Sequence, residues 1–372
     1  MDSNKKKRIT SIDALRAVTL LGILLVHTRS GFGFNFQGDH SIIDTLVNSV
    51  IYITLVHKCN LIFSALFGVS FYLILRNPHN TSGKFVWRCF LLMIIGLFNK
   101  LFYTYDALMW YGLWGMCLVA IRQLRNAHIF LLFIFLTFFS IFLRSFSLGD
   151  FLFGISESDR YALDSIWDMI FYPYAVVDYL RIVFNYGIFN TLSFFLLGYW
   201  IARVGIIERL DSIVTNKVVI FLWSFSAFSY FLLFFDHSEH SEHSHFLRLL
   251  NNYAMAFSYS ATLVYVYYHY GAFNKFLHYL EPYGKLGLTN YSIMGIVGVI
   301  LMSDFGLGLY KINVSISLIV LLLFYLIQVL FSIIWLNYFR YGPMEYLWRV
   351  ATERKMIEIK KESSSSQRQS RH

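Results

Sequence analysis

Charged residues, prolines and glycines are all scarce in this chain of 372 residues. Only 14% of the residues are Asp, Glu, Lys or Arg, while 57% are hydrophobic, which is far from the composition of an ordinary soluble domain. Four prolines and 22 glycines are too few for a loop-rich or fibrous chain. The apolar runs are about twenty residues long. They lack the alternation of apolar and polar residues that is typical of strands in a membrane barrel. The sequence therefore predicts an all-α, polytopic integral membrane protein.

Signatures of several enzyme classes are also absent from the sequence. No Walker motif, no HExxH and no GxGxxG after a predicted strand occurs, so nucleotide hydrolysis and dinucleotide redox chemistry have no support. Cys59, Cys89 and Cys117 stand singly in or beside apolar runs, without a CxxC pair. They fit small core residues, so neither a disulfide framework nor a zinc site is expected. We predict no metal cofactor.

The net charge of +9 has its main source near the two ends of the chain. Basic residues cluster at 5–8, before the first apolar run, and again between 349 and 371, after the last one. Flanks of this kind orient a membrane protein with that side in the cytoplasm and favour anionic lipid. Membrane lipid is therefore an expected partner, and nucleic acid is not.

Windows of about twenty residues define about ten candidate membrane spans. They cover residues 12–27, 60–75, 85–102, 108–121, 128–146, 186–204, 218–235, 253–270, 286–302 and 316–336. Residues 42–56 form a further apolar stretch that could lie at the membrane interface. Basic connections alternate with acidic ones along this order, so an even number of spans with both termini in the cytoplasm satisfies the positive-inside rule.

One helical membrane domain, residues 12–349, is expected to make up nearly all of the chain. A basic cytoplasmic segment, 1–11, precedes it, and a basic, polar tail, 350–372, follows it and is expected to be disordered. The connection 147–185 is expected outside the membrane, where its length favours a functional or packed element over a plain linker.

The first span carries three ionisable residues, Asp13, Arg16 and His27. At about 100° per residue, His27 is turned by about 20° from Arg16 around the helix axis and Asp13 by about 60°, so the three share one face. Charges at this depth are costly unless they face a protein interior or water. Asp13 and Arg16 could simply neutralise each other, and His27 could be a packed, neutral histidine. The functional alternative makes His27 a general base, because its ordinary pKa lies near working pH.

A second group of polar residues flanks an external turn. Asn99 and Asp106 stand on either side of it, and Lys100 could pair with Asp106 in the headgroup zone. Tyr111 follows in the next span, four residues before a glycine that allows close helix packing. Asn99, Asp106 and Tyr111 are candidate substrate-binding residues.

A third group opens the ninth span near the cytoplasmic face. Thr289, Asn290 and Tyr291 are candidate substrate-binding residues, although capping of the helix is the simpler role. Glu345, after the last span, is expected to form a local ion cluster with neighbouring arginines. The tract 236–245 repeats His-Ser-Glu, so metal binding or pH sensing is possible there, but a solvated external loop is favoured.

Seven segments spread over nearly the whole chain resemble a known family. They are DALR (13–16) with LLGIL after it, FSALFGVSF (63–71) in a segment ending at Arg76, DALMWY (106–111), FLLGYWIAR (195–203), GLTNY (287–291), FGLGL (305–309) and WLNYFRYGPMEYLWR (335–349). In this order they resemble the YeiB-like bacterial membrane proteins, domain-of-unknown-function family 418. The resemblance implies a multi-pass protein of the bacterial cytoplasmic (inner) membrane.

That family is similar in its opening segment to membrane acyltransferases of the acyltransferase-3 and heparan-glucosaminide acetyltransferase types. In the acyltransferase-3 type, an Arg followed by ten residues and a His marks the first span, and Arg16 to His27 matches this spacing. The implied reaction transfers an acyl group from cytoplasmic acyl-CoA, the donor substrate, to an envelope carbohydrate or lipid. In it, His27 deprotonates the acceptor, and Arg16, oriented by Asp13, contacts phosphate or polarises the carbonyl.

Two other classes of function remain open from the sequence. In a small-molecule transporter or permease, the same buried charges would form a substrate or proton path. A non-catalytic membrane scaffold would use them only for packing. Binding of acyl-CoA would separate the enzyme from both alternatives.

Overall fold

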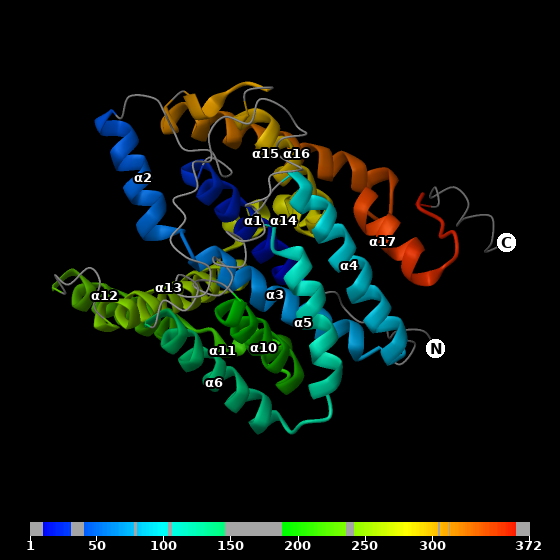
Figure 1. The fold of residues 1–372 in the computed structure, drawn as a ribbon, viewed down its shortest axis with the longest axis horizontal. Coiled ribbons are helices and arrows are strands. Elements are labelled where there is room, and N and C mark those ends of the chain that lie inside the picture. Colours follow the sequence, from blue (N-terminus) through cyan, green and yellow to red (C-terminus); the bar gives the residue numbers. More distant parts are fainter. Residues whose placement is uncertain are drawn as a thin grey trace.

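Helices make up most of the chain that the structure describes (Figure 1). The computed structural model describes residues 10–30, 41–77, 80–102, 106–145, 188–235, 242–303, 306–311 and 313–361. Within these ranges no strand is present, and the one isolated β-bridge joins Phe339 to Lys360. The predicted all-α class is confirmed. The predicted external connection 147–185 lies outside the described residues.

The helices follow one another with few long connections. Their bounds are α1 Thr10–Ser30, α2 Ile42–Thr54, α3 Lys58–Leu75, α4 Ser82–Phe102, α5 Leu108–Ile121, α6 Asn126–Ser145, α10 Ile188–Val204, α11 Leu210–Ile213, α12 Asn216–Phe235, α13 Glu242–His269, α14 Gly271–Lys285, α15 Gly287–Met302, α16 Val314–Tyr338 and α17 Pro343–Glu353. Short 3-10 turns cover Ile207–Arg209 and Leu309–Lys311. Each of the ten predicted spans overlaps one of these helices.

Fewer helices are long and apolar enough to cross a membrane than the sequence predicts. Six pass by length and composition, or up to eight if each of two bent pairs is one span. The bent pairs are Phe189–Val204 with Ile207–Ile213, at 65°, and Gly271–Lys285 with Gly287–Met302, at 76°. The described chain is therefore that of a multi-pass membrane protein with six to eight candidate spans.

The first helix, α1, turns its polar face towards the protein interior. Ala17, Leu20 and Leu24 have no exposed surface, and Asp13 is 2% exposed. Leu21 and Leu25, on other sides of the helix, are partly exposed. The expectation that the face with Asp13 and Arg16 looks into protein is thus confirmed by the burial of its neighbours.

Two glycines let α1 and α3 touch other helices through the backbone. A Cβ atom added at Gly284 of α14 would lie 1.9 Å from the carbonyl oxygen of Asp13. One added at Gly68 of α3 would lie 1.9 Å from the carbonyl oxygen of Phe195 in α10. Neither position has room for a larger side chain, so small residues set both helix contacts.

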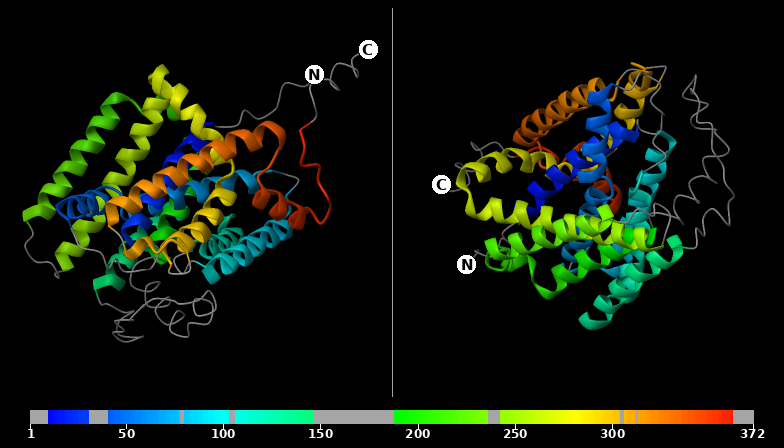
Figure 2. Two further views of the ribbon diagram at one scale, coloured as in Figure 1. Left: turned by 90° about the horizontal axis from the view of Figure 1, so that it is seen from above. Right: turned by 90° about the vertical axis from the view of Figure 1, so that its left-hand side faces the viewer.

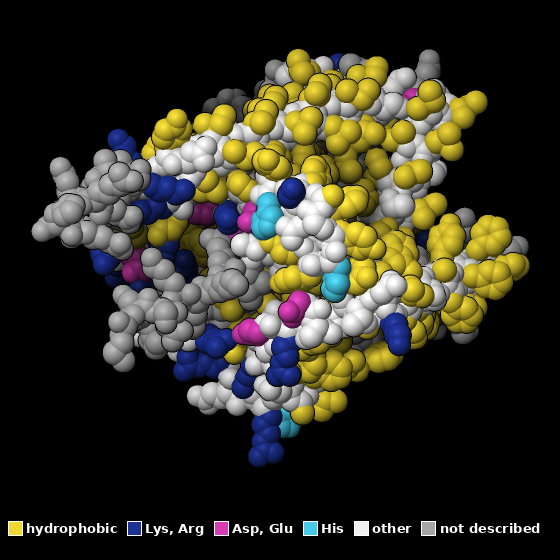
Figure 3. Space-filling view, turned by 180° about the vertical axis from the view of Figure 1, so that it is seen from behind, with side chains coloured by type: hydrophobic (Ala, Val, Ile, Leu, Met, Phe, Trp, Pro, Cys, Tyr) yellow, Lys and Arg dark blue, Asp and Glu magenta, His cyan; other side chains and the backbone are white. Residues whose placement is uncertain are grey.

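Helices α12 and α13 form an antiparallel pair that projects from the rest of the bundle (Figures 1 and 2). Trp223 bonds to Thr262, and Ser226 to Ser258, each at 2.9 Å. The remaining surface of α12 is apolar and exposed, with Phe221 at 68% and Phe234 at 69%. Apolar side chains also cover much of the face in Figure 3, with Lys and Arg gathered towards one side. Such a surface suits lipid.

The last helix, α17, packs against the first half of α4. Lys84 pairs with Glu353 at 2.6 Å, and the indole nitrogen of Trp348 donates to the Arg88 carbonyl oxygen at 2.8 Å. The Arg88 guanidinium lies 4.7 Å from the centre of the Trp348 ring. Residues after α17 pair back with the end of α16, since the amide of Lys361 donates to the Tyr338 carbonyl oxygen at 3.0 Å. The segment up to residue 361 is therefore part of the fold.

Candidate functional site

The Arg16 cluster joins α1 to α3. Arg16 donates to the Asp13 carboxylate at 2.9 Å and to the hydroxyl of Ser70 in α3. The Asp13 side chain is 3% exposed, whereas 21% of the Arg16 side chain is exposed. Asp13 therefore holds an arginine whose side chain remains partly exposed. The sequence-based pairing of Asp13 with Arg16 is confirmed, and Ser70 is an addition that the sequence did not indicate.

His27 lies on the same helix, about 16 Å further along by the usual helical rise. Its side chain is half-buried. Leu20 and Ile23 lie on the same face between His27 and Arg16, within about 40° of Arg16 around the axis. They are 0% and 3% exposed. Arg16 and His27 thus occupy two levels of one face, closed off from each other by apolar side chains in this state.

A further cluster, around a buried carboxylate, lies near the start of α1. Glu281 of α14 is 5% exposed and accepts a hydrogen bond from Tyr267 at 2.9 Å. The Tyr267 hydroxyl in turn bonds to the hydroxyl of Thr10. His278 and Lys285 pair with the same carboxylate, Lys285 at 3.5 Å. This cluster fixes the beginning of α1 against α13 and α14.

The Asp106 cluster joins the turn between α4 and α5 to α15. Asn99 donates to the Asp106 carboxylate at 3.2 Å and to the Ser292 hydroxyl at 3.1 Å. The other Asp106 oxygen accepts from the Leu108 amide at 2.9 Å. Asn99 is 3% exposed and Asp106 is 2% exposed. Burial raises the pKa of Asp106 to about 7, in opposition to the hydrogen bonds from Asn99 and Leu108, which lower it.

Two tyrosines extend this cluster through stacked rings. The Tyr291 hydroxyl accepts from the Ala107 amide at 3.1 Å, and its ring stacks on Phe63 with centroids 5.8 Å apart. The Tyr111 hydroxyl bonds to Ser64 at 3.0 Å and its ring stacks on Phe67. Of the predicted substrate-binding residues, Asn99, Asp106, Tyr111 and Tyr291 are therefore brought together, each bonded to neighbouring helices.

Thr289 caps α15 together with a residue from α17. The Glu345 carboxylate accepts from the Leu288 amide at 2.8 Å and from the Thr289 amide at 3.1 Å, as well as from the Thr289 hydroxyl. The Thr289 hydroxyl also accepts from the Met344 amide at 3.0 Å. Burial raises the pKa of Glu345, although the hydrogen bonds from Thr289 and Leu288 act to lower it. Glu345 was expected in a local ion cluster, and its described hydrogen bonds instead satisfy the start of a helix.

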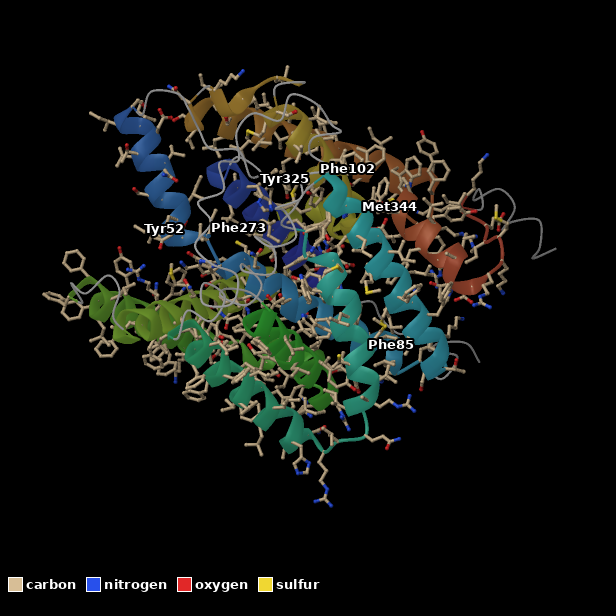
Figure 4. All side chains as sticks on the ribbon, in the orientation of Figure 1. Tyr52, Phe85, Phe102, Phe273, Tyr325 and Met344 are labelled. Carbon is tan, nitrogen blue, oxygen red and sulfur yellow. The ribbon has the colours of Figure 1, made fainter. Side chains whose placement is uncertain are left out.

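Asn290 lies at the centre of a separate buried network. Its amide nitrogen donates to the Tyr283 carbonyl oxygen at 3.0 Å and to Ser332 at 2.9 Å. Gln328 of α16 donates to the Asn290 carbonyl oxygen at 3.1 Å. Nearby, Tyr325 points into the bundle (Figure 4), where its hydroxyl donates to the Ala17 carbonyl oxygen at 3.4 Å. This network ties α15 and α16 to α1.

The predicted site residues thus fall into separate groups. Asp13 and Arg16 form one, the Asp106 cluster a second, Thr289 with Glu345 a third and Asn290 a fourth. Among the described residues no group of three or more His, Cys, Asp or Glu side chains could hold a metal ion. Most of the His-rich tract, 236–241, lies outside the described residues.

Part of the chain matches a protein family whose description assigns no activity. Residues 201–355 match the family described as "Protein of unknown function (DUF418)". The chain is 27% identical to the "Uncharacterized 39.9 kDa protein in amylase 3'region" of Bacillus acidopullulyticus, over 95% of this chain and 96% of that protein. It is 24% identical to the uncharacterized protein YxaH of Bacillus subtilis, over 93% and 94%. A 71-residue stretch is 38% identical to YeiB of Escherichia coli, 19% of this chain and 18% of YeiB.

Proposed function

We propose that this protein is a membrane acyltransferase. The premise is that residues 201–355 match the DUF418 family and that the chain is homologous to YeiB and YxaH. It moves an acyl group from cytoplasmic acyl-CoA to an envelope carbohydrate or lipid. It resides in the bacterial cytoplasmic membrane with about ten passes and both termini in the cytoplasm, in accord with the positive-inside rule. In this arrangement the two bent pairs bring the six passes to eight, and α5 and α13 supply the other two.

The partly exposed side chain of Arg16 is the observation that carries this proposal. A buried acid, Asp13, and a hydroxyl, Ser70, hold it in place, and 21% of its side chain is exposed. An arginine held in this way is pre-organised to contact phosphate or a carbonyl oxygen. Asp13 and Ser70 are positioning residues, and Arg16 is the group that meets the donor.

His27 acts as the base in the proposed reaction. Its ring takes the proton from the acceptor hydroxyl or amine, the acceptor atom forms a bond to the thioester carbonyl carbon, and the carbon–sulfur bond breaks. The CoA thiolate leaves and is protonated. Because Leu20 and Ile23 close the face between Arg16 and His27, transfer includes a state in which the bundle opens at this level.

Transfer of label from acyl-CoA tests the role of His27. Membranes containing the protein are given acetyl-CoA or palmitoyl-CoA with a labelled acyl group, and label in the lipid and glycan fractions is counted. We expect His27→Ala to lose transfer while its amount in the membrane is unchanged. The matched control is His128→Ala, because His128 is exposed on α6. Unchanged transfer by His27→Ala would contradict the assignment of His27 as the base.

A transporter is the second candidate, and the bent helix pairs favour it. Broken helices commonly form substrate sites in transporters, and α14 and α15 meet at 76°. However, the Leu288 and Thr289 amides at the start of α15 already donate to Glu345, so they are not open to a substrate. Flux into vesicles without any acyl donor would support transport, and acyl-CoA binding without flux would support the enzyme.

A further inference from the structure

Two sequence segments that lie far apart in the chain pack directly on each other. Gly198 of α10 meets the backbone of Ala65 in α3, just as Gly68 meets Phe195. This close approach brings Tyr72 and Tyr199 together at the ends of the two helices, with ring centroids 5.6 Å apart. Tyr199 is 3% exposed. The contact creates a fixed, partly buried platform at the end of α3 and α10.

An arginine beside this platform has a buried nitrogen without a partner. Nη1 of Arg203, in the last turn of α10, is buried and makes no hydrogen bond within the described part of the chain. The Arg203 guanidinium also lies close enough to the Tyr199 hydroxyl to act on it. The guanidinium therefore lies beside Tyr199, with its Nη1 group unsatisfied. A buried, charged donor of this kind requires an acceptor.

A second arginine approaches the same tyrosine from another helix. Arg122, just after α5, is close enough for its charge to act on the Tyr199 hydroxyl. It donates to the hydroxyl of Ser82, at the start of α4, at 2.6 Å. The acid nearest in the chain, Glu208, pairs with Arg76 at 3.0 Å. The charges of Arg203 and Arg122 thus both act on Tyr199, while Glu208 already has a partner.

We propose that Arg203 and Arg122, with Tyr199 and Ser82, form a binding site for a phosphate-bearing anion at this end of the bundle. Phosphate supplies the acceptor that Nη1 of Arg203 requires, and guanidinium groups match its geometry. The positive-inside rule explains basic helix ends in general, but it does not explain a buried, unpartnered guanidinium nitrogen beside a tyrosine. The site shares no residue with the Arg16 cluster, and the proposal does not depend on acyl transfer.

The phosphate could belong to a soluble compound or to a lipid headgroup, and two arms of one experiment distinguish these sources. In the first arm, the full chain in phosphatidylcholine nanodiscs is titrated calorimetrically with inorganic pyrophosphate. In the second, its Tm is compared between phosphatidylcholine and phosphatidylglycerol nanodiscs. The variants are Arg203→Gln and Arg122→Gln. The controls are Arg209→Gln and Arg125→Gln, which remove exposed arginines nearby in the chain and change the net charge equally.

We expect either saturable binding of pyrophosphate in the first arm or a higher Tm in phosphatidylglycerol in the second. Both site variants should weaken pyrophosphate binding about tenfold or more, or abolish the Tm increase given by phosphatidylglycerol, as loss of a charged hydrogen bond implies. Both controls should behave as the unmodified protein. If Arg203→Gln lowers the ligand-free Tm, Arg203→Lys and Arg122→Gln carry the test, because Lys keeps the charge but loses the planar fork. Binding in neither arm, or equal losses in the controls, overturns the proposal.

Discussion

The Arg16 cluster and the Asp106 cluster place charged chemistry inside the same apolar bundle in opposite ways. Arg16 is held by Asp13 and Ser70, yet a fifth of its side chain, 21%, is exposed. Asp106 is 2% exposed, and its described hydrogen bonds come from Asn99 and Leu108. Both arrangements join helices, and in the proposed function the first also orients a group towards a ligand. Under that proposal, buried polar groups serve two purposes in this protein.

The difference predicts that Asp106 matters most for stability. Asp106→Ala should lower the free energy of unfolding by about 3 kcal/mol, because the buried donors of Asn99 and Leu108 lose their acceptor. The measurement is denaturant or thermal unfolding in a fixed detergent. Asp211→Ala, at an exposed aspartate, is the control and should change little. A loss no larger than that of the control would show that the cluster does not join the helices.

Removal of Glu345 should have the next largest effect. Glu345→Ala leaves the Leu288 and Thr289 amides at the start of α15 without their acceptor, so we expect a loss of about 2 kcal/mol. The same unfolding assay measures it. Glu358→Ala, at an exposed glutamate nearby in the chain, should be near neutral, and equal losses in the two variants would contradict the capping role.

The Asp106 cluster should also make stability depend on pH. The pKa of Asp106 is about 7 in the folded protein, above the ordinary value of about 3.9 for an unfolded aspartate. The folded state therefore binds the proton more tightly, and this contribution to stability is complete below about pH 4 and is lost as pH rises to about 7. Tm measured across this window should show the decline in the unmodified protein. The decline should be weaker in Asp106→Asn, and an identical slope would contradict the assignment.

Smaller changes within each cluster sharpen the comparison. Tyr291→Phe removes the acceptor of the Ala107 amide and should cost about 1 kcal/mol of stability. The control is Tyr279→Phe, because Tyr279 is 68% exposed. Unfolding midpoints measure both, and an unchanged midpoint in Tyr291→Phe would show that this bond does not hold the turn.

Ser70→Ala should have the smallest effect on stability, below about 1 kcal/mol. It removes one partner of Arg16, so acyl-CoA binding should weaken even though Asp13 remains in place. Ser260→Ala, whose hydroxyl bonds to its own helix at 2.8 Å, is the control for binding and for stability. Binding that is as strong in Ser70→Ala as in the control would remove Ser70 from the positioning of Arg16.

Local patterns in the sequence were sufficient to predict much of the fold. The shared face of Asp13 and Arg16 follows from helical periodicity alone, and the burial of Leu20 agrees with it. Helix α14 was missed because Lys275, Glu281 and Lys285 make residues 271–285 too polar for a hydropathy window. Its apolar face becomes meaningful only when it packs against α1.

Contacts between distant segments were beyond what the sequence alone could predict. Ser70 lies 54 residues from Arg16, and Glu345 lies 56 residues from Thr289. No local sequence pattern indicates either contact, and a serine or glutamate near a helix end has many possible partners. The sequence therefore indicated which residues were unusual, and the packing of the helices determined which of them meet.

Equilibrium binding of acyl-CoA tests the contrast between the two clusters most directly. Labelled acetyl-CoA and palmitoyl-CoA are bound to the purified protein, to Arg16→Gln and to Asp106→Asn, with Arg125→Gln as the matched charge control. The account predicts that Arg16→Gln weakens binding about tenfold or more, while Asp106→Asn and Arg125→Gln bind as the unmodified protein does. Loss of binding in Asp106→Asn with full binding in Arg16→Gln would contradict it.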